Sequence, residues 1–498
     1  MSVKVMLKNN TYENFLTFNS FCDYVIARPD FYEDIVSFDI SEENYTVENG
    51  VVLNTENLSI VFWLPNLEDN TLIIPEQAKF LFAEFYEKIK HKKIEKIVFN
   101  EKVFDGAVIN YLDNLKEVDT SKSKALLFED GILYDNEKTV IYGCCGNGNG
   151  KPIVINKEIS DIRYDAFRKC TRDIVLAEDN LCFTMFDDAI YDREMGLLVA
   201  YPFNKTKEIL TFPKEMRWTP LVSCLPKCFS KFAVEDGNKV FATVDGILYD
   251  KNIETLKYYP PKKMDKIYKM PDTVKRITIS ALSECNAEEI VIGKSFEIAI
   301  SYPSEEKWSV EGDYLSIGLT AAKRVQKYSI NENNENLTVI DGVLYSKDER
   351  YLVAFPPMKS AEFNFPDKCF NCNEFAFRNC VLNEISLNKL SEIANMNPPK
   401  FLTQMNFLEK VNFSEKGEYY MRDGVIYQHG KIPRIDMILQ GVTNFTVKQM
   451  TELSPHVLIN SDVRRIYVYS YVDIKHFKNI NEEAFENSPF KIQFVILP

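Results

Sequence analysis

The chain is short of the residues and segments on which several functional classes depend. It has four histidines among 498 residues, and none lies in an H-E-x-x-H or triad-like arrangement. No stretch approaches the roughly eighteen consecutive apolar residues that a transmembrane helix needs. The first ten residues are interrupted by lysine and asparagine, so they lack the apolar run of a secretory signal. These absences argue against an enzyme, predict that nothing spans a membrane and place the chain in a cytoplasm.

Positive charge is also scarce. The chain has 59 lysines and arginines against 73 aspartates and glutamates, a formal net charge of −14. Broad nucleic-acid binding needs a basic face, so nucleic acid is an unlikely partner. Eleven cysteines is an odd number for a disulfide framework. We expect them to be reduced, as in a cytoplasm.

What the chain has in abundance is one repeated motif. Its clearest copy runs over Val339–Pro357 and predicts two strands, Gly342–Tyr345 and Tyr351–Phe355, joined by the polar loop Ser346–Arg350. The other copies begin at Asn49, Asp130, Asp187, Asp245 and Asp423. Six copies of one pattern outweigh any other signal and predict a repeat array.

A second motif follows the first at a constant distance. It is seen as Ala166–Cys170, Ala281–Cys285 and Ala376–Cys380, with a variant at Cys224–Cys228. The step from Cys170 to Cys228 is 58 residues and the step from Cys228 to Cys285 is 57. The next step, to Cys380, is 95, so that unit carries about 38 extra residues. The hairpins show the same insertion, with 96 residues from Gly246 to Gly342.

After this motif comes a strand of the form apolar-x-x-apolar-x-apolar. In such a strand the last two apolar residues point into the core and the intervening residues point to solvent. The matches are Ile94/Ile97/Phe99, Phe229/Phe232/Val234, Leu382/Ile385/Leu387, Leu408/Val411/Phe413 and Val463/Ile466/Val468. Residues 1–45 do not fit the repeat. Apolar residues from Tyr12 to Val25 at three- and four-residue steps predict one amphipathic helix there, as an N-terminal capping segment.

Together these motifs resemble the BspA-type leucine-rich repeat, over residues 46–498. The resemblance implies an α/β leucine-rich-repeat solenoid, a β-rich right-handed superhelix of stacked strands with projecting hairpins. It also implies a binding activity, often as a surface protein that contacts host proteins. Two departures are visible. The chain lacks a secretion signal, and the unit at Ile292–Ile330 is degenerate.

Three segments suggest chemistry, and each has a simpler interpretation. Gly143–Lys151 is rich in glycine, but Cys145 stands where a Walker loop needs glycine, and Pro152 follows the lysine. Cys369 and Cys372 have C-x-x-C spacing without a second pair, and they fall at core positions of the repeat. The carboxylate pairs suit the solvated faces of an acidic chain. The sequence therefore predicts no catalytic, cofactor or metal site.

Aromatic and arginine side chains are the better candidates for partner contact, because they dominate interface energies. A tyrosine recurs at one hairpin position, at residues 134, 191, 249, 345 and 427, and is expected to pack in the core. The irregular aromatics Trp63, Trp218, Trp308, Tyr467, Tyr469 and Tyr471 are expected to make contacts. Arg464 and Arg465 depart from the acidic trend on the outward side of their strand. Either they form a solvated strand face or, with Tyr467, they bind a partner.

The segment Ala484–Pro498 raises a further question. Ile492, Val495 and Leu497 fit the strand pattern, while Phe494 and Ile496 add apolar groups at the intervening positions. No residues follow to cap this coil, and uncovered coils leave apolar groups and a strand edge in water. An earlier segment, a second copy by two-fold symmetry or the partner would have to cover it. Phe494 and Ile496 are thus candidate partner or self-association residues.

The pattern as a whole predicts an elongated, non-catalytic leucine-rich-repeat scaffold. Its expected work is recognition of a macromolecule, a protein by preference, in a cytoplasm, because a curved array offers a long surface that varies without cost to the core. Three alternatives stay open: a secreted or cell-surface adhesin, a sensor subunit of an immune or defence pathway, and an enzyme or metal protein built on the solenoid.

Overall fold

The computed structural model describes most of the chain. The described residues are 3–15, 17–81, 93–146, 148, 150–163, 165–202, 207–219, 225, 227–297, 317–360, 363–369, 371–387, 400–405, 407–413, 418–439, 441–459 and 461–498. Within them the protein is β-rich; the helices α1, α2, α5 and α6 lie near the two ends of the sequence, and residues 317–320 are also helical. The β-rich, stacked-coil part of the expected fold is confirmed, whereas the α/β description is not.

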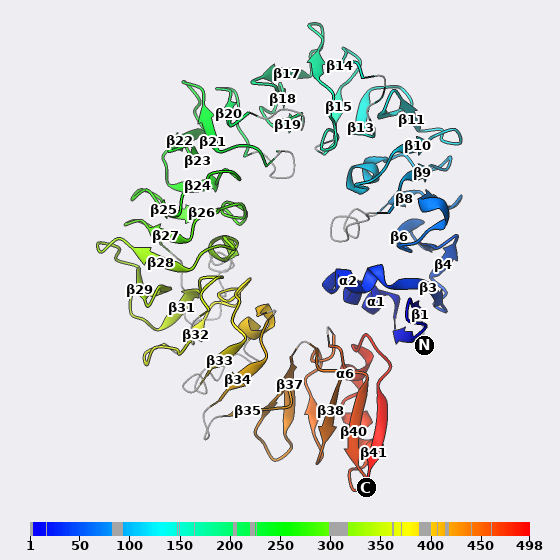
Figure 1. Cartoon of the computed structure of the whole chain (residues 1–498), viewed down its shortest axis with the longest axis vertical. Coiled ribbons are helices and arrows are strands. Elements are labelled where there is room, and N and C mark those ends of the chain that lie inside the picture. The colour runs from blue at the N-terminus through cyan, green and yellow to red at the C-terminus, as the bar shows by residue number, and fades with distance from the viewer. Residues whose placement is uncertain are drawn as a thin grey trace.

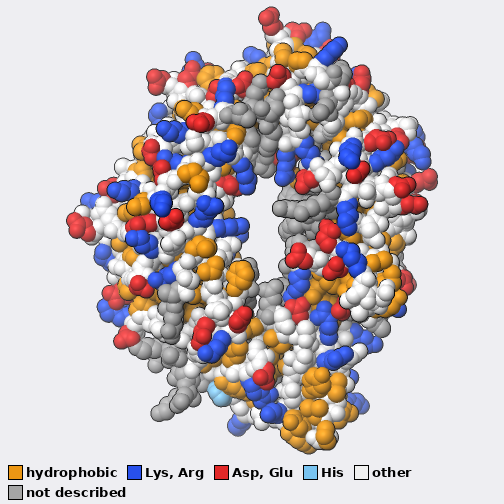
Figure 2. All heavy atoms as spheres, viewed as in Figure 1, with side chains coloured by type: hydrophobic (Ala, Val, Ile, Leu, Met, Phe, Trp, Pro, Cys, Tyr) orange, Lys and Arg blue, Asp and Glu red, His pale blue; other side chains and the backbone are white. Residues whose placement is uncertain are grey.

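The coils follow one another around a closed ring (Figure 1). The N-terminal segment lies beside the last coils, and Figure 2 shows an opening at the centre of the molecule. The expectation of an elongated solenoid was therefore wrong: successive coils rotate by a small amount each, and the rotation accumulates until the ends meet.

Each repeated motif folds as a three-stranded antiparallel meander rather than a two-stranded hairpin. In the clearest copy β29 (Leu337–Ile340), β30 (Val343–Ser346) and β31 (Tyr351–Ala354) lie side by side. The predicted pair corresponds to β30 and β31, and the missed first strand joins β30 through Asp341 and Gly342. Their φ angles of 47° and 77° are those of a type I′ turn, which suits Asp-Gly.

The same turn recurs in all six copies. Every first residue of the turn has φ near 50°, and glycine follows it in five of the copies. In the third copy Asp188 takes the glycine position with φ 67°, a conformation that aspartate tolerates better than most residues. The turn therefore fixes the register of each meander, even where glycine is absent.

The meanders alternate with short parallel ladders. The other meanders are β4 (Tyr45–Glu48), β5 (Val51–Asn54), β6 (Ser59–Trp63); β11 (Leu126–Glu129), β12 (Ile132–Asp135), β13 (Val140–Cys144); β17 (Phe183–Phe186), β18 (Ala189–Asp192), β19 (Leu198–Ala200); β22 (Phe241–Val244), β23 (Ile247–Asp250), β24 (Thr255–Tyr258); and β35 (Tyr419–Arg422), β36 (Val425–Gln428), β37 (Arg434–Ile438). Five meanders gain a short parallel fourth strand: β8 (Phe80–Leu81), β15 (Asp161–Ile162), β26 (Arg276–Ile277), β32 (Asn371–Cys372) or β39 (Glu452–Leu453).

The ladders hold the strands that the apolar pattern predicted. They are β7 (Thr71–Ile73), β9 (Lys96–Val98), β10 (Glu117–Asp119); β14 (Ile153–Ile155), β16 (Ile174–Leu176); β20 (Ile209–Phe212), β21 (Lys231–Val234); β25 (Ile267–Lys269), β27 (Glu289–Ile292), β28 (Lys327–Ile330); β33 (Glu384–Ser386), β34 (Lys410–Asn412); and β38 (Asn444–Val447), β40 (Arg465–Tyr469), β41 (Gln493–Leu497). Short 3-10 turns η1 (Glu68–Asn70), η2 (Ala107–Tyr111) and η5 (Lys400–Gln404) lie between strands. The central apolar residue of each predicted strand is buried, as in Ile97, Phe232 and Ile466.

The insertion before the fifth meander is an additional coil. Its strand β28 extends the parallel ladder beyond β27 and pairs with it from Glu289 to Ile292. The extra residues therefore add one ladder strand without a meander, which keeps the array continuous where the sequence pattern is weakest. Residues 298–316 of this unit lie outside the described part.

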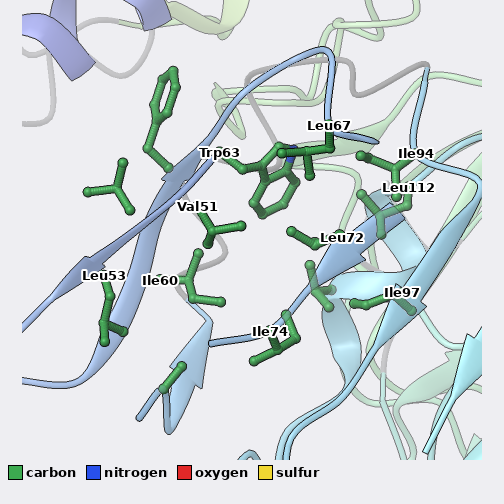
Figure 3. Close-up of a cluster of buried hydrophobic side chains, with 14 of the residues drawn as sticks. Val51, Leu53, Ile60, Trp63, Leu67, Leu72, Ile74, Ile94, Ile97 and Leu112 are labelled. Carbon is green, nitrogen blue, oxygen red and sulfur yellow. The ribbon is translucent and has the colours of Figure 1, made fainter. Parts of the chain in front are cut away.

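The core runs along the inside of the coils, and the first coil shows how it is filled. Figure 3 shows Trp63 of β6 against Val51, Leu67 and Leu72, with Ile94 and the ladder residue Ile97 beyond. Trp63 is fully buried. The expectation that it contacts a partner was wrong, because the third strand of the meander turns this side chain into the core.

The recurring tyrosines are core residues, as expected. Tyr191, Tyr249, Tyr345 and Tyr427 are buried, each in the core of its own coil, while Tyr134 is half-buried. The meander sets Tyr345 opposite Leu352, and both belong to one cluster with Phe355. The motif therefore carries an aromatic anchor that fastens each meander to its coil.

We expect Tyr345→Ala to lower the free energy of unfolding by about 3 kcal/mol, because it leaves a cavity where a buried ring was. Guanidinium denaturation measures the loss. The exposed Tyr471→Ala serves as the matched control and should unfold like the unaltered protein. An unchanged melting temperature for Tyr345→Ala would show that the ring does not anchor the meander.

Helices α1, α2, α5 and α6 lie at the two ends of the sequence. The N-terminal segment consists of β1 (Val3–Leu7), β2 (Tyr12–Phe15), α1 (Phe18–Ala27), α2 (Pro29–Glu33) and β3 (Ile35–Ile40). The predicted single helix begins only at Phe18, because Tyr12–Phe15 pairs with β1 as a strand. Near the other end, α5 (Ile474–Ile480) and α6 (Glu482–Glu486) precede β41.

Candidate functional site: the C-terminal sheet and the seam

The C-terminal sheet β38-β40-β41 holds four of the five residues singled out as candidate partner contacts, and the fifth, Arg464, directly precedes β40. Its three strands are parallel, with Phe445, Ile466 and Phe494 in one row and Val447, Val468 and Ile496 in the next. Ile466 and Val468 are buried. Phe494 and Ile496 therefore lie on the core side of the sheet.

This register corrects the expected orientation of β41. The pattern placed Val495 and Leu497 in the core and Phe494 and Ile496 at the intervening positions, but the structure has the reverse. Phe494 packs against Phe477 of α5 and Phe485 of α6, with ring centroids 6.2 and 5.6 Å away. Ile496, on the same side of the strand, is 63% exposed.

The outer side of the sheet carries an apolar surface that we call the tyrosine face, formed by Tyr467, Tyr469, Tyr471, Val495 and Leu497. Tyr469 and Tyr471 stack with centroids 5.4 Å apart, and Tyr471 is 72% exposed. The other three are half-buried. Figure 2 shows hydrophobic side chains gathered at the lower end of the molecule, where β40 and β41 end. Contiguous exposed apolar surface on a folded protein marks an interaction site.

The second feature of this region is the contact between the two ends of the chain, which we call the seam. Phe15 of β2 forms an antiparallel bridge with Phe490, and the two rings lie 4.7 Å apart. Tyr24 of α1 meets the Phe490 ring edge-on at 4.8 Å. These aromatic rings are buried, so residues about 470 positions apart share one apolar core.

Charged side chains reinforce the seam. Asp462 accepts hydrogen bonds from the Tyr24 hydroxyl at 2.7 Å and from the Arg28 guanidinium at 2.9 Å. Arg464 donates to Glu13 at 2.9 Å, and its guanidinium lies 3.9 Å from the centroid of the Phe490 ring. Buried charges need such partners, because an unpaired one is costly to desolvate. The seam is therefore both apolar and charge-paired.

The pKa values of the seam follow from this pairing. Burial tends to raise the pKa of Asp462, but the hydrogen bond from Tyr24 and the charge of Arg28 outweigh it and hold the pKa below its usual range. Burial tends to lower the pKa of Arg464, but its hydrogen bonds to Glu13 and Tyr24 raise it instead. Both groups stay ionised near neutral pH.

The structure places the five candidate residues in different surroundings. Arg464 does not point outward: its side chain is held within the seam, so it is a structural residue. Arg465 and Tyr467 lie on the outer side of β40 as expected. Phe494 is mostly covered by the helices, and Ile496 is exposed at the end of β41. Tyr469 and Tyr471 were among the aromatic candidates, whereas the seam had no local signal beyond the unusual arginine pair.

Other candidate residues are placed as follows. Trp218 is exposed and Trp308 lies outside the described residues. Cys369 and Cys372 are buried in the core around Phe377, and burial raises the pKa of the Cys369 thiol to about 11. The described part of Gly143–Lys151 continues β13 into a turn, where Arg172 donates to Lys151 O and to Asp130. These contacts suit packing roles for the two segments.

Among the described residues, no three His, Cys, Asp or Glu side chains come together as a metal ion would require. In the same part of the chain, no helix has the length and apolar content for a bilayer span.

Known proteins match this chain only at low identity. No protein-family model matches the chain, and no curated protein does. Among solved structures, the pneumococcal vaccine antigen PcpA is 14% identical, with 92% of this chain and 98% of that chain covered and a TM-score of 0.30. A leucine-rich cell surface protein from Faecalibacterium prausnitzii is 12% identical, with 92% and 96% covered and a TM-score of 0.23. A leucine-rich repeat protein from Eubacterium ventriosum is 12% identical, with 91% and 84% covered and a TM-score of 0.21. Two of these three matches are thus described as leucine-rich or leucine-rich repeat proteins of bacteria.

Proposed function

We propose that this chain, whose repeats resemble the BspA-type leucine-rich repeat, is a non-catalytic scaffold that recognises a protein partner. The observation that carries the proposal is the tyrosine face. Exposed apolar side chains lose their contact with water when a partner covers them, and tyrosine adds a hydroxyl that can hydrogen-bond at the rim of the interface. Neighbouring outward positions on β38 are Asn444 and Thr446, so the apolar surface begins only at β40.

The proposal places this recognition in a cytoplasm. The ten cysteines of the described part are free, and seven of them are buried in coil cores. Free cysteines are stable where thiols are kept reduced. The closed ring supports a scaffold role as well, because α5 and α6 pack on the core side of the sheet that carries the tyrosine face, and the N-terminal segment holds Phe490 just before β41.

The test is capture of a protein from the native lysate, with the partner identified by mass spectrometry and its affinity then measured with purified components. We expect Tyr469→Ala with Tyr471→Ala to weaken binding by at least about tenfold, because stacked tyrosines are typical interface anchors. Leu181→Ala with Met264→Ala is the matched control, since both residues are exposed apolar side chains on other coils.

Equal binding by the tyrosine variant and the unaltered protein would exclude the tyrosine face. Sedimentation of the same variants tests whether a second copy of this chain, rather than another protein, covers the tyrosine face. Self-association through this end of the chain predicts a dimer that the tyrosine variant dissociates, whereas a partner-binding face predicts a monomer in both.

A further inference from the structure

A groove of about 1180 Å³ lies along the seam and reaches the edge of the tyrosine face at Val495. One wall is β2, through Tyr12, Glu13 and Asn14, and the other is the start of β41, through Gln493 and Phe494. The groove thus lies between the first and the last parts of the ring.

The groove exists because a ladder between these two strands begins and then stops. Lys491 N–H donates to Asn14 O at 3.3 Å, next to the bridge between Phe15 and Phe490. Continued in register, this ladder would set Tyr12 opposite Gln493. Instead Gln493 N–H donates to Arg464 O at 2.8 Å, which ties β41 to β40. The two strands therefore diverge from the bridge.

Divergence leaves two strand edges facing the groove. Among the described residues β2 pairs along its length only with β1, and β41 pairs only with β40. The backbone of Gln493 points to β40, so the alternation along a strand turns the N–H and C=O of Phe494 to the free edge. An exposed edge of this kind accepts a further strand through main-chain hydrogen bonds.

The charged side chains that line the groove indicate which side chains an added strand would need. Arg465, Lys478 and Lys491 line it, and none of them has a carboxylate partner within 4.0 Å in the described part of the chain. The carboxylates that line the groove are paired with other cations: Glu13 forms an ion pair with Arg464, and Asp462 forms one with Arg28. In a chain of net charge −14, a groove with three unpaired cations favours an anionic occupant.

We propose that the seam groove binds an acidic peptide in extended conformation, which adds as a strand to the free edge of β41. Its main chain pairs with Phe494, and its carboxylates meet Arg465, Lys478 and Lys491. Lys478 already lies 4.4 Å from the centroid of the Phe494 ring, so it is held over the groove. The groove adjoins the tyrosine face at Val495, but neither Lys478 nor Lys491 belongs to that face, so their replacement tests the groove alone.

The probe is a fluorescein-labelled peptide of alternating glutamate and valine with blocked ends, titrated with the full chain and read by fluorescence anisotropy. We expect saturable binding that weakens as salt is added, because exposed charges are screened. Lys478→Glu with Lys491→Glu should weaken it by at least about tenfold. Lys102→Glu with Lys122→Glu is the matched control, since these lysines are equally exposed and unpaired but lie outside the groove.

Two further probes decide the mode of binding. The same peptide with alternate N-methylated amides keeps its charge but cannot pair along an edge, so it should lose most of its affinity. Inorganic phosphate and a short single-stranded DNA should not displace the labelled peptide when each is added at the same total negative charge as the peptide. Unchanged binding of the methylated peptide, equal competition by either anion, or equal binding by the groove variant would each overturn the proposal.

Discussion

Replacing Phe15 by alanine should lower the free energy of unfolding by about 4 kcal/mol, a cost within the range for a buried phenylalanine. The ring is fully buried and lies 5.1 Å from Phe21, 5.4 Å from Tyr24 and 4.7 Å from Phe490, measured between centroids. Its loss leaves a cavity on both sides of the seam at once. Guanidinium denaturation measures the stability, and small-angle X-ray scattering measures whether the ring opens.

A double-mutant cycle makes this prediction specific. Phe490→Ala should lower the free energy of unfolding by a similar amount. The double variant should lose less free energy than the sum of the two single losses, because the two rings share one contact. Phe377→Ala is the matched control: its ring is equally buried in a coil on another part of the ring, so it should destabilise without enlarging the molecule. Strict additivity of Phe15 and Phe490 would contradict the aromatic contact across the seam.

Asp462→Ala should lower the free energy of unfolding by about 4 kcal/mol, as much as Phe15→Ala. The carboxylate accepts hydrogen bonds from Tyr24, Arg28 and the Gly441 N–H, and its side chain is only 12% exposed. Removing one partner of a buried ion pair typically costs about 3–5 kcal/mol, because the remaining charge is left unpaired. Thermal and guanidinium unfolding of the variant measure the loss, and Asp423→Asn, which alters an exposed carboxylate, should be neutral.

The same residue gives the seam a defined pH dependence. Since the pKa of Asp462 is lower in the folded protein than in the unfolded chain, its stabilisation is present above the unfolded value of about 3.9. It is lost as the pH falls through the lower, folded value. Asp462→Asn should therefore flatten part of the acid limb of the stability curve below about pH 4. An acid limb identical to that of the unaltered protein would show that the carboxylate does not bind in the seam.

Local patterns predicted the repeats well, because each coil is stabilised by its nearest neighbours. The spacing of Ile94, Ile97 and Phe99 reports a strand whose core face packs on the next coil, and the structure has that strand as β9. The meander was predicted in part. Its first strand, Leu337–Ile340 in the clearest copy, was missed, although the Asp-Gly pair that follows it is a strong hairpin signal.

Ring closure could not be predicted in this way. The hydrogen bond between Tyr24 and Asp462 joins residues 438 positions apart, and no local pattern near either residue depends on the other. It results from small rotations summed over every coil. The orientation of β41 was predicted wrongly for another reason. Both faces of this strand are apolar, with Phe494 on one side and Val495 on the other, so the alternation of apolar and polar residues does not show which face is buried.

The seam also changes the statistical behaviour of the array. A linear stack of coils is a one-dimensional chain of nearest-neighbour couplings, and its terminal units fray because each lacks one neighbour. The contact of Phe15 with Phe490 gives the first and last units a neighbour, which is equivalent to a periodic boundary. Amide hydrogens of β1 and β40 should then exchange as slowly as those of mid-ring strands such as β23, and cutting the seam should restore fraying at both ends together.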